Sequence, residues 1–257
     1  MTPGAAFLKR GAKVIRGLWR YVLFVSQFRT FSKMAASGVA PRFDFKWRNR
    51  YPCLNDNTAT TGFDRHYLYH PAWAARVLAS TKPRLHIDIS STLNFCSLVS
   101  AFVPTQFFDF RPANIHLSNL DCKAANLLRL PFANEEIHSI SCMHVVEHIG
   151  LGRYGDSLDP DGDLKAMSEL SRVLAVAGNL LFVVPVGAPT VMFNAHRVYS
   201  YQQIVKSFEN LELVSFSLIR EFPAIDGILT NASASDVAEE SYGCGCFWFT
   251  KKERQNV

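Results

Sequence analysis

Short apolar runs alternate with helix-like stretches along the middle of the 257-residue chain. Continuous apolar runs of this length are typical of strands that are buried on both faces of a sheet. The expected strands cover residues 84–89, 105–110, 137–143 and 179–186, with a further short one near 115–118, and the expected helices between them cover 93–102 and 163–175. Because strands and helices alternate, the pattern predicts βαβ units and a mostly parallel sheet.

The regions on either side have different patterns. Helical periodicity over residues 64–80 predicts a helix before the first strand. Apolar runs at 211–219 and 244–252 have no long helix between them, which predicts an antiparallel pair that closes the sheet. With 48% hydrophobic residues, the chain can bury the core of one α/β domain. We therefore expect that domain at 64–257 and an N-terminal extension with its linker at 1–63.

The N-terminal extension is strongly basic. Residues 1–50 hold eleven Lys and Arg residues against the single acid Asp44, a balance of +10, so residues 51–257 carry a balance of −5 within the net charge of +5. Apolar residues recur at helical spacing over 7–28, with basic residues on the other side. The longest apolar run, Tyr21 to Val25, is far too short to cross a bilayer.

Two interpretations of this basic amphipathic helix remain open. It lies on an anionic membrane surface as a peripheral contact, or it packs on its own domain with its basic residues in water. Nucleic acid is not expected as a partner, because no binding motif accompanies the charge. The six cysteines form no compact secreted framework. A cytoplasmic location is expected, peripheral at the membrane if the helix binds lipid.

Three segments carry a resemblance to a known family. They are LLRLPFANEEIHSISCMHVVEHI at 127–149, LKAMSELSRVLAVAGNLLFVVPVG at 164–187 and RVYSYQQIVKSF at 197–208. In order and spacing they resemble class I S-adenosylmethionine-dependent methyltransferases, over about residues 84–220. The resemblance implies a Rossmann-like α/β fold with a mostly parallel seven-stranded sheet, an antiparallel C-terminal strand and S-adenosylmethionine as cofactor.

Three further segments narrow the resemblance. HYLYHPAWAARVL, EHIGLGRYGD and FNAHRVYS look like a branch of uncharacterised proteins, a domain of unknown function with a methyltransferase-like core that is often associated with bacterial glycan or cell-surface loci. This implies a sugar, glycan or other small polar molecule as the methyl acceptor. A shared fold does not by itself establish a shared reaction.

Several residues are candidates for cofactor contacts. The resemblance implies that Asp88, which ends the first strand, contacts the methionine end and that Asp109, which ends the second, accepts the two ribose hydroxyls. Asn126, followed by Leu127, stands where the family usually has an Asp for the adenine amino group, and its amide oxygen accepts the same hydrogen bond. Tyr67 lies where related enzymes cover the methionine carboxylate, although an aromatic residue in a helix also suits a core.

The turn after the first strand departs from the family pattern. Ser90, Thr92 and Asn94 occupy positions where glycines usually allow positive φ and a close approach of the cofactor. Two strained residues, Ser90 and Thr92, would cost ~1 to 3 kcal/mol each and weaken binding tens to thousands of times. Alternatively, the turn bends differently and its hydroxyls serve as donors.

Polar residues after the fourth strand are candidates for catalysis: His144, Glu147, His148 and Tyr154. A His or carboxylate here would act as general base on an acceptor hydroxyl or amine. Alternatively, Glu147 and His148 begin a helix and stabilise its first turn. The candidates for acceptor binding are Arg153, Asn194, His196 and Arg197.

No metal site is expected from the sequence. His66 and His70 are spaced to share a helix face, but no third ligand is evident. Cys244 and Cys246 are interpreted as structural thiols.

Three functions are therefore considered. The first is an S-adenosylmethionine-dependent methyltransferase acting on a sugar or another small polar acceptor. The second is a catalytically inactive, methyltransferase-like scaffold or binding protein with a degenerate cofactor turn. The third is a nucleotide-sugar-binding protein that uses the same edge of the sheet.

Overall fold

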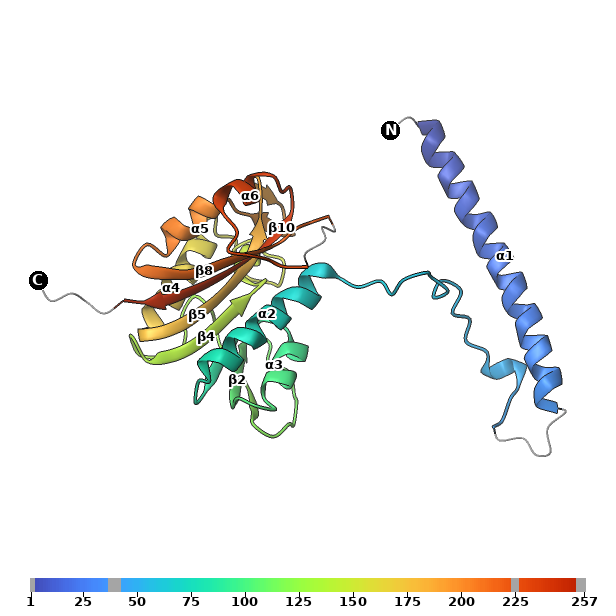
Figure 1. Ribbon diagram of the computed structural model, residues 1–257, viewed down its shortest axis with the longest axis horizontal. Helices are drawn as coiled ribbons and strands as arrows, with labels where there is room; N and C mark the ends of the chain where they lie inside the picture. Colours follow the sequence, from blue (N-terminus) through green and yellow to red (C-terminus); the bar gives the residue numbers. More distant parts are fainter. Residues whose placement is uncertain (1–2, 37–42, 223–226, 253–257) are drawn as a thin grey trace, which may run out of the picture. The chain divides into compact units, whose positions relative to one another are not determined.

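A central sheet that is buried on both faces organises the larger part of the chain. The computed structural model describes residues 3–36, 43–222 and 227–252 (Figure 1). By its contacts the chain divides into two compact units, Met1–Gly62 and Phe63–Val257.

The strand order in the larger unit is β3-β2-β1-β4-β5-β10-β8-β9, counted over the described residues. The strands are β1 (His86–Ile89), β2 (Thr105–Asp109), β3 (Leu120–Ala124), β4 (Ile137–Met143), β5 (Leu174–Val186), β8 (Leu211–Ile219), β9 (Leu229–Thr230) and β10 (Gly243–Lys251). The first five are parallel, and β10 runs antiparallel between β5 and β8. The parallel sheet and the antiparallel closing pair were both predicted, and the short β9 brings the strand number to eight instead of seven.

One strand was predicted in the wrong place. The strand expected near 115–118 does not form; β3 begins at Leu120 instead and pairs with β2. Asn119 has a φ of 61°, which turns the chain just before the strand. Leu120 is buried, whereas Leu117 is half exposed and makes only an isolated bridge.

Helices cover both faces of the sheet (Figure 1). They are α2 (Arg65–Thr81), α3 (Leu93–Val99), α4 (Gly162–Val173), α5 (Tyr201–Ser207) and α6 (Ala234–Ala238), with a 3-10 turn η2 (Val146–His148) and a hairpin of β6 (Thr190–Met192) and β7 (His196–Val198). Along β5, Phe182 and Val184 pack on the side of α4 and α5, whereas Leu181 and Val183 pack on the side of α2 and α3. This two-sided burial explains the continuous apolar runs in the sequence.

The smaller unit is built on one long helix, α1 (Pro3–Ala36), followed by a short 3-10 turn η1 (Trp47–Asn49). One side of α1 packs on the following segment, where Phe28 stacks on Phe45 and meets the edge of Trp47. A different side exposes large apolar residues, and Trp19 is 64% exposed. None of the helices in the described parts of the chain is long and apolar enough to cross a membrane.

Candidate functional site

Two adjoining cavities lie at the carboxyl edge of the parallel strands. The first, of about 700 Å³, is lined by His66, His144, His148 and His196 among others, and is called the histidine cavity. The second, of about 440 Å³, has Leu127 and Leu128 in its wall and is called the leucine cavity. Both volumes suit a small-molecule ligand. Since Ser90, His144, His148 and Tyr154 line both cavities, the two are neighbouring parts of one site.

The leucine cavity brings together the predicted cofactor residues Asp109, Asn126 and Leu127. Asp109 ends β2, and its Oδ1 accepts a hydrogen bond from the Arg111 backbone at 2.7 Å. The Oδ1 of Asn126 accepts one from the Leu128 backbone at 2.9 Å. Each of these oxygens has a second lone pair, so both side chains retain acceptor capacity toward a ligand.

The turn after β1 contains one strained serine. Ser90 has a φ of 55°, and its hydroxyl donates to the Phe108 carbonyl at 3.1 Å. Thr92 has a φ of −105° and caps α3 by accepting a hydrogen bond from the Phe95 backbone. The prediction of strain at Thr92 was therefore wrong, because this residue begins a helix from extended backbone. Asn94 lies within α3, in the wall of a separate hollow that Thr92 and Asp109 share.

Asp88 lies behind this turn. It is fully buried and is not among the described residues that line either cavity. Its carboxylate accepts hydrogen bonds from the Ser91 backbone at 3.0 Å and from the Ser141 hydroxyl on β4. Burial raises the pKa of Asp88 to about 6, against the lowering effect of these hydrogen bonds. Asp88 therefore ties the turn to β1 and β4, and a contact with a ligand stays a prediction.

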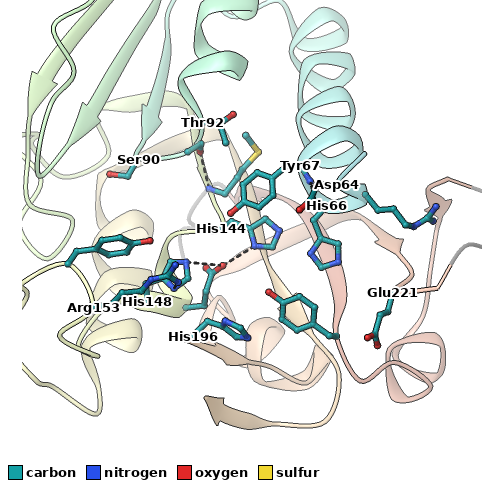
Figure 2. Close-up of a pocket in the computed structure, with 16 residues that line it drawn as sticks. Asp64, His66, Tyr67, Ser90, Thr92, His144, His148, Arg153, His196 and Glu221 are labelled. Atoms are coloured by element: carbon teal, nitrogen blue, oxygen red, sulfur yellow. Dashed lines mark hydrogen bonds and ion pairs between the residues drawn. The ribbon is translucent and has the colours of Figure 1, made fainter. Parts of the chain in front are cut away.

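All four predicted catalytic residues line the histidine cavity (Figure 2). The Nδ1 of His144 lies 2.9 Å from Oε1 of Glu147, and Nε2 of His148 lies 3.8 Å from the same oxygen. Glu147 is only 1% exposed, and its Oε2 has no hydrogen-bond partner within the described ranges. The alternative that Glu147 and His148 begin a helix holds only in part: both lie in the single 3-10 turn η2, and the carboxyl group also faces two imidazoles.

Burial favours the neutral form of three imidazoles of this cavity. It lowers the pKa of His144 and of His66 to about 4, and it also lowers the pKa of His148. Burial likewise raises the pKa of Glu147 to about 7 and that of Tyr242 to about 12. The cavity thus presents neutral rings at His66, His144 and His148 and a protonated phenol at Tyr242 around the buried Glu147 carboxyl group.

Two of the four predicted acceptor residues reach the histidine cavity. Arg153 lines it and donates to the Ala195 carbonyl at 2.9 Å, and the Nε2 of His196 is buried without a partner among the residues that the structure describes. Arg197 lies elsewhere: its guanidinium donates to the Ile149 carbonyl at 2.7 Å and to other backbone carbonyls, which is a structural role. Asn194 is exposed on the loop between β6 and β7, outside both cavity walls.

Sequence reasoning placed Tyr67 of α2 at the site but missed His66 of the same helix and Tyr242, which directly precedes β10. Tyr67, a predicted cofactor residue, lines the histidine cavity and stacks on His144 with ring centroids 5.4 Å apart. His66 stacks on Tyr242 at 5.2 Å, and Tyr242 also lies 5.0 Å from the ring of His196. The only sequence signal was the spacing of His66 and His70, because strand pairing alone brings residues near 242 to this edge.

Comparisons with known proteins agree with this architecture. A family described as a Caenorhabditis protein of unknown function, DUF268, matches residues 130–224, which include the EHIGLGRYGD and FNAHR segments. No curated protein matches the sequence.

Several solved structures share the fold at low sequence identity. The N-methyltransferase NodS from Bradyrhizobium japonicum WM9 is 16% identical, with a TM-score of 0.51 over 88% of this chain and 99% of its own. The 1,6-didemethyltoxoflavin-N1-methyltransferase from Burkholderia thailandensis is 8% identical, with a TM-score of 0.52 over 72% and 79%. A candidate methyltransferase from Bacillus halodurans C-125 is 15% identical, with a TM-score of 0.50 over 71% and 99%. Residues 63–257 therefore adopt the Rossmann-like methyltransferase fold.

The raised pKa of Asp88 predicts a pH-dependent stability. Its ordinary pKa is 3.8, and in the folded chain it is about 6. Below about pH 4 the carboxyl is protonated in both states, and above about pH 6 its ionisation penalises only the folded state. When the pH is raised from about 4.5 to about 7.5, the unfolding free energy of Asp88→Asn should therefore rise by roughly 1–3 kcal/mol relative to that of the wild type.

Urea unfolding of both proteins at the two pH values measures this gain. Asp121→Asn, at an exposed position on β3, is the matched control and should keep a constant difference from the wild type. A constant difference for Asp88→Asn as well would contradict the assigned pKa.

Proposed function

We propose that this protein is an S-adenosylmethionine-dependent methyltransferase whose acceptor is a small polar molecule such as a sugar or glycan. The observation that carries the proposal is the pair of adjoining cavities, which share Ser90 and His144 at the carboxyl edge of the sheet. In Rossmann-like sheets, ligands bind at this edge. Two chains of similar fold, the enzymes from Bradyrhizobium japonicum and Burkholderia thailandensis, were solved with S-adenosylhomocysteine.

The leucine cavity suits the adenosyl part of the cofactor. The Asp109 carboxylate would accept the ribose hydroxyls, and the free lone pair of the Asn126 amide oxygen would accept from the adenine amino group. Leu127, Leu128 and Ile149 offer apolar surface to the faces of the base. The residues present therefore fit the group, with Ser90 at the point where the two cavities meet.

The bound cofactor would supply an electrophilic methyl group carried on a sulfonium. His148 is the residue placed to take the proton that leaves the acceptor hydroxyl or amine. Its Nδ1 lies 2.7 Å from the Ala195 carbonyl oxygen, so the neutral ring donates there and leaves Nε2 as the free acceptor. Proton transfer to Nε2 makes an imidazolium that faces the Glu147 carboxyl 3.8 Å away, which stabilises the charge.

The rest of the histidine cavity supports a polar acceptor. Tyr67 and Tyr242 combine aromatic faces with hydroxyl groups, and Arg153 and Glu221 contribute charges of both signs. Such a wall can pack against a flat apolar surface of the acceptor while it bonds to the hydroxyls of that molecule. A sugar carries both features.

The strained Ser90 favours a second candidate, an inactive scaffold that has kept the fold. A side chain at positive φ places a Cβ where the family usually has a glycine, next to the space for the cofactor. The two candidates differ in one measurable property, which is the affinity for the cofactor.

Removal of the ribose acceptor should weaken cofactor binding. In calorimetry with S-adenosylhomocysteine, Asp109→Asn should bind about tenfold to a hundredfold more weakly, because a charge-assisted hydrogen bond is lost. Asp121→Asn, on the neighbouring strand and outside both cavity walls, should bind like the wild type. Equal binding by all three proteins would place the cofactor elsewhere.

Replacement of the strained serine should strengthen cofactor binding. Ser90→Gly removes the Cβ beside the space for the cofactor, so S-adenosylhomocysteine should bind about tenfold more tightly. Thr92→Gly is the matched control: it removes the cap of α3, costs about 1 kcal/mol of stability and should not improve binding. Absence of binding in both the wild type and Ser90→Gly at millimolar ligand would overturn the methyltransferase proposal in favour of the scaffold.

We also propose that α1 binds the surface of an anionic membrane. Its exposed apolar residues Ile15, Leu18, Trp19 and Val22 fall on one side of the helix, away from the aromatic residues that pack on the segment 43–47. The excess of positive charge in this part of the chain complements anionic lipid headgroups.

Flotation of the full chain with vesicles that contain phosphatidylserine tests this contact. Leu18→Glu together with Trp19→Glu should abolish flotation, because the apolar anchor is lost. Arg16→Glu with Arg20→Glu should weaken it most at low salt, and Gln27→Glu should change it little. Flotation that is insensitive to the Leu18 and Trp19 changes would exclude this surface.

A further inference from the structure

Two residues in the wall of the histidine cavity and a buried cysteine behind it form a cluster that methyl transfer does not use. His66, His144 and Cys244 each offer one ligand atom, and these atoms all lie within 4.8 Å of one another. The Nε2 of His144 lies 3.4 Å from the Cys244 sulfur. We propose that this cluster binds a transition-metal ion of the Zn²⁺ type. The proposal does not depend on methyl transfer, because none of the three residues was assigned a step in it.

The cluster is assembled from three separate elements. His66 comes from the first turn of α2, His144 follows β4, and Cys244 lies near the start of β10, where it pairs with Pro185 on β5. Figure 2 shows the rings of His66 and His144 next to each other, and the two rings stack with their centroids 5.4 Å apart. The sequence predicted no metal site, because no third ligand was evident near His66. The fold supplies that ligand as Cys244, which is distant in the sequence.

The hydrogen bond of His144 orients it as a ligand. Its Nδ1 lies 2.9 Å from Oε1 of Glu147, so this nitrogen carries the proton and Nε2 keeps its lone pair toward Cys244. Histidines that bind metals usually donate their other N–H to a carboxylate or carbonyl in this way. Glu147 thus occupies the position of a supporting carboxylate.

A second observation points independently to a missing cation. The Oε2 of Glu147 is buried and has no hydrogen-bond partner in the part of the chain that the structure describes. A buried carboxyl group with an unpaired oxygen is costly unless positive charge lies nearby. An ion bound to Nε2 of His144 would place positive charge close to the Glu147 carboxyl group, on the other side of the imidazole ring.

The ligand types select the class of ion. Two imidazole nitrogens and one thiolate suit Zn²⁺ or Co²⁺, whereas Mg²⁺ and Ca²⁺ prefer oxygen ligands. Binding displaces the Cys244 proton to solvent, and the sulfur becomes a thiolate bonded to the metal. Three protein ligands leave a fourth position open, and His66 and His144 line the histidine cavity, so that position faces the cavity. Water, or an oxygen or sulfur atom of a bound molecule, would complete the coordination.

Metal titration of the full-length protein tests the site without any cofactor. After treatment with a chelator, the chain should take up about one Zn²⁺ in competition with a chromophoric chelator, and Co²⁺ should produce a thiolate-to-metal charge-transfer band. Cys244→Ser should lose that band and bind Zn²⁺ at least about a hundredfold more weakly. Cys142→Ser, a buried thiol on the other face of the sheet, is the matched control and should keep both.

Two further variants separate a ligand from a folding residue. Circular dichroism reports whether each variant is folded. His66→Gln changes a partly exposed residue at the start of α2, so it tests the site even if Cys244→Ser does not fold. Glu147→Gln should weaken Zn²⁺ binding about tenfold to a hundredfold while the Co²⁺ thiolate band persists. The proposal is overturned if folded wild type takes up no Zn²⁺, or if folded His66→Gln binds it as tightly as Cys142→Ser does.

Discussion

The parallel register of β1 with β2 and β4 decides where the functional groups that follow these strands lie. Asp88 on β1 is level with Phe107 on β2 and with Ser141 on β4, so the three strands end at one edge of the sheet. The buried Asp88 carboxylate reinforces this alignment, since it bonds both to Ser141 and to the turn after β1. His86 continues the network behind it through the hydroxyls of Ser139 and Ser141. A shift of one residue in the pairing register would turn these polar side chains into the apolar layers, and the site residues would no longer gather at one edge of the sheet.

The strands that carry the site were predictable because their sequence pattern is local. The bounds of β4 and β8 are those predicted, since each is a continuous apolar run between polar residues. The prediction for β5 was less accurate: the strand begins at Leu174, where a helix was still expected. Its pairing with β4 is irregular before Asn179, and Ala177 has a positive φ. A bulged strand entry of this kind has no apolar periodicity that distinguishes it from the end of a helix.

The site was predictable only where it follows a strand directly. Asp109 and His144 could be located because each comes at or just after the end of a strand. The contributions of His66, Tyr242 and Cys244 could not, because they depend on how α2 and β10 pack on the sheet. The turn after β1 was predictable in part: the sequence indicated strain there, and the structure confines it to Ser90, because Thr92 starts a helix from extended backbone.

Glu147 links the two proposed activities of the histidine cavity through a single carboxyl group. Its Oε1 fixes the tautomer of His144, at 2.9 Å, and faces the Nε2 of His148, at 3.8 Å. A cation bound beside His144 would draw electron density from the carboxylate and so reduce its ability to stabilise an imidazolium at His148. Conversely, a proton on His148 would compete with the metal for the same negative charge. Both effects act through one buried carboxyl group with an unpaired oxygen. Occupation of the metal site should therefore control the basicity of His148 toward the acceptor, even though the ion binds His144 and the acceptor proton binds His148.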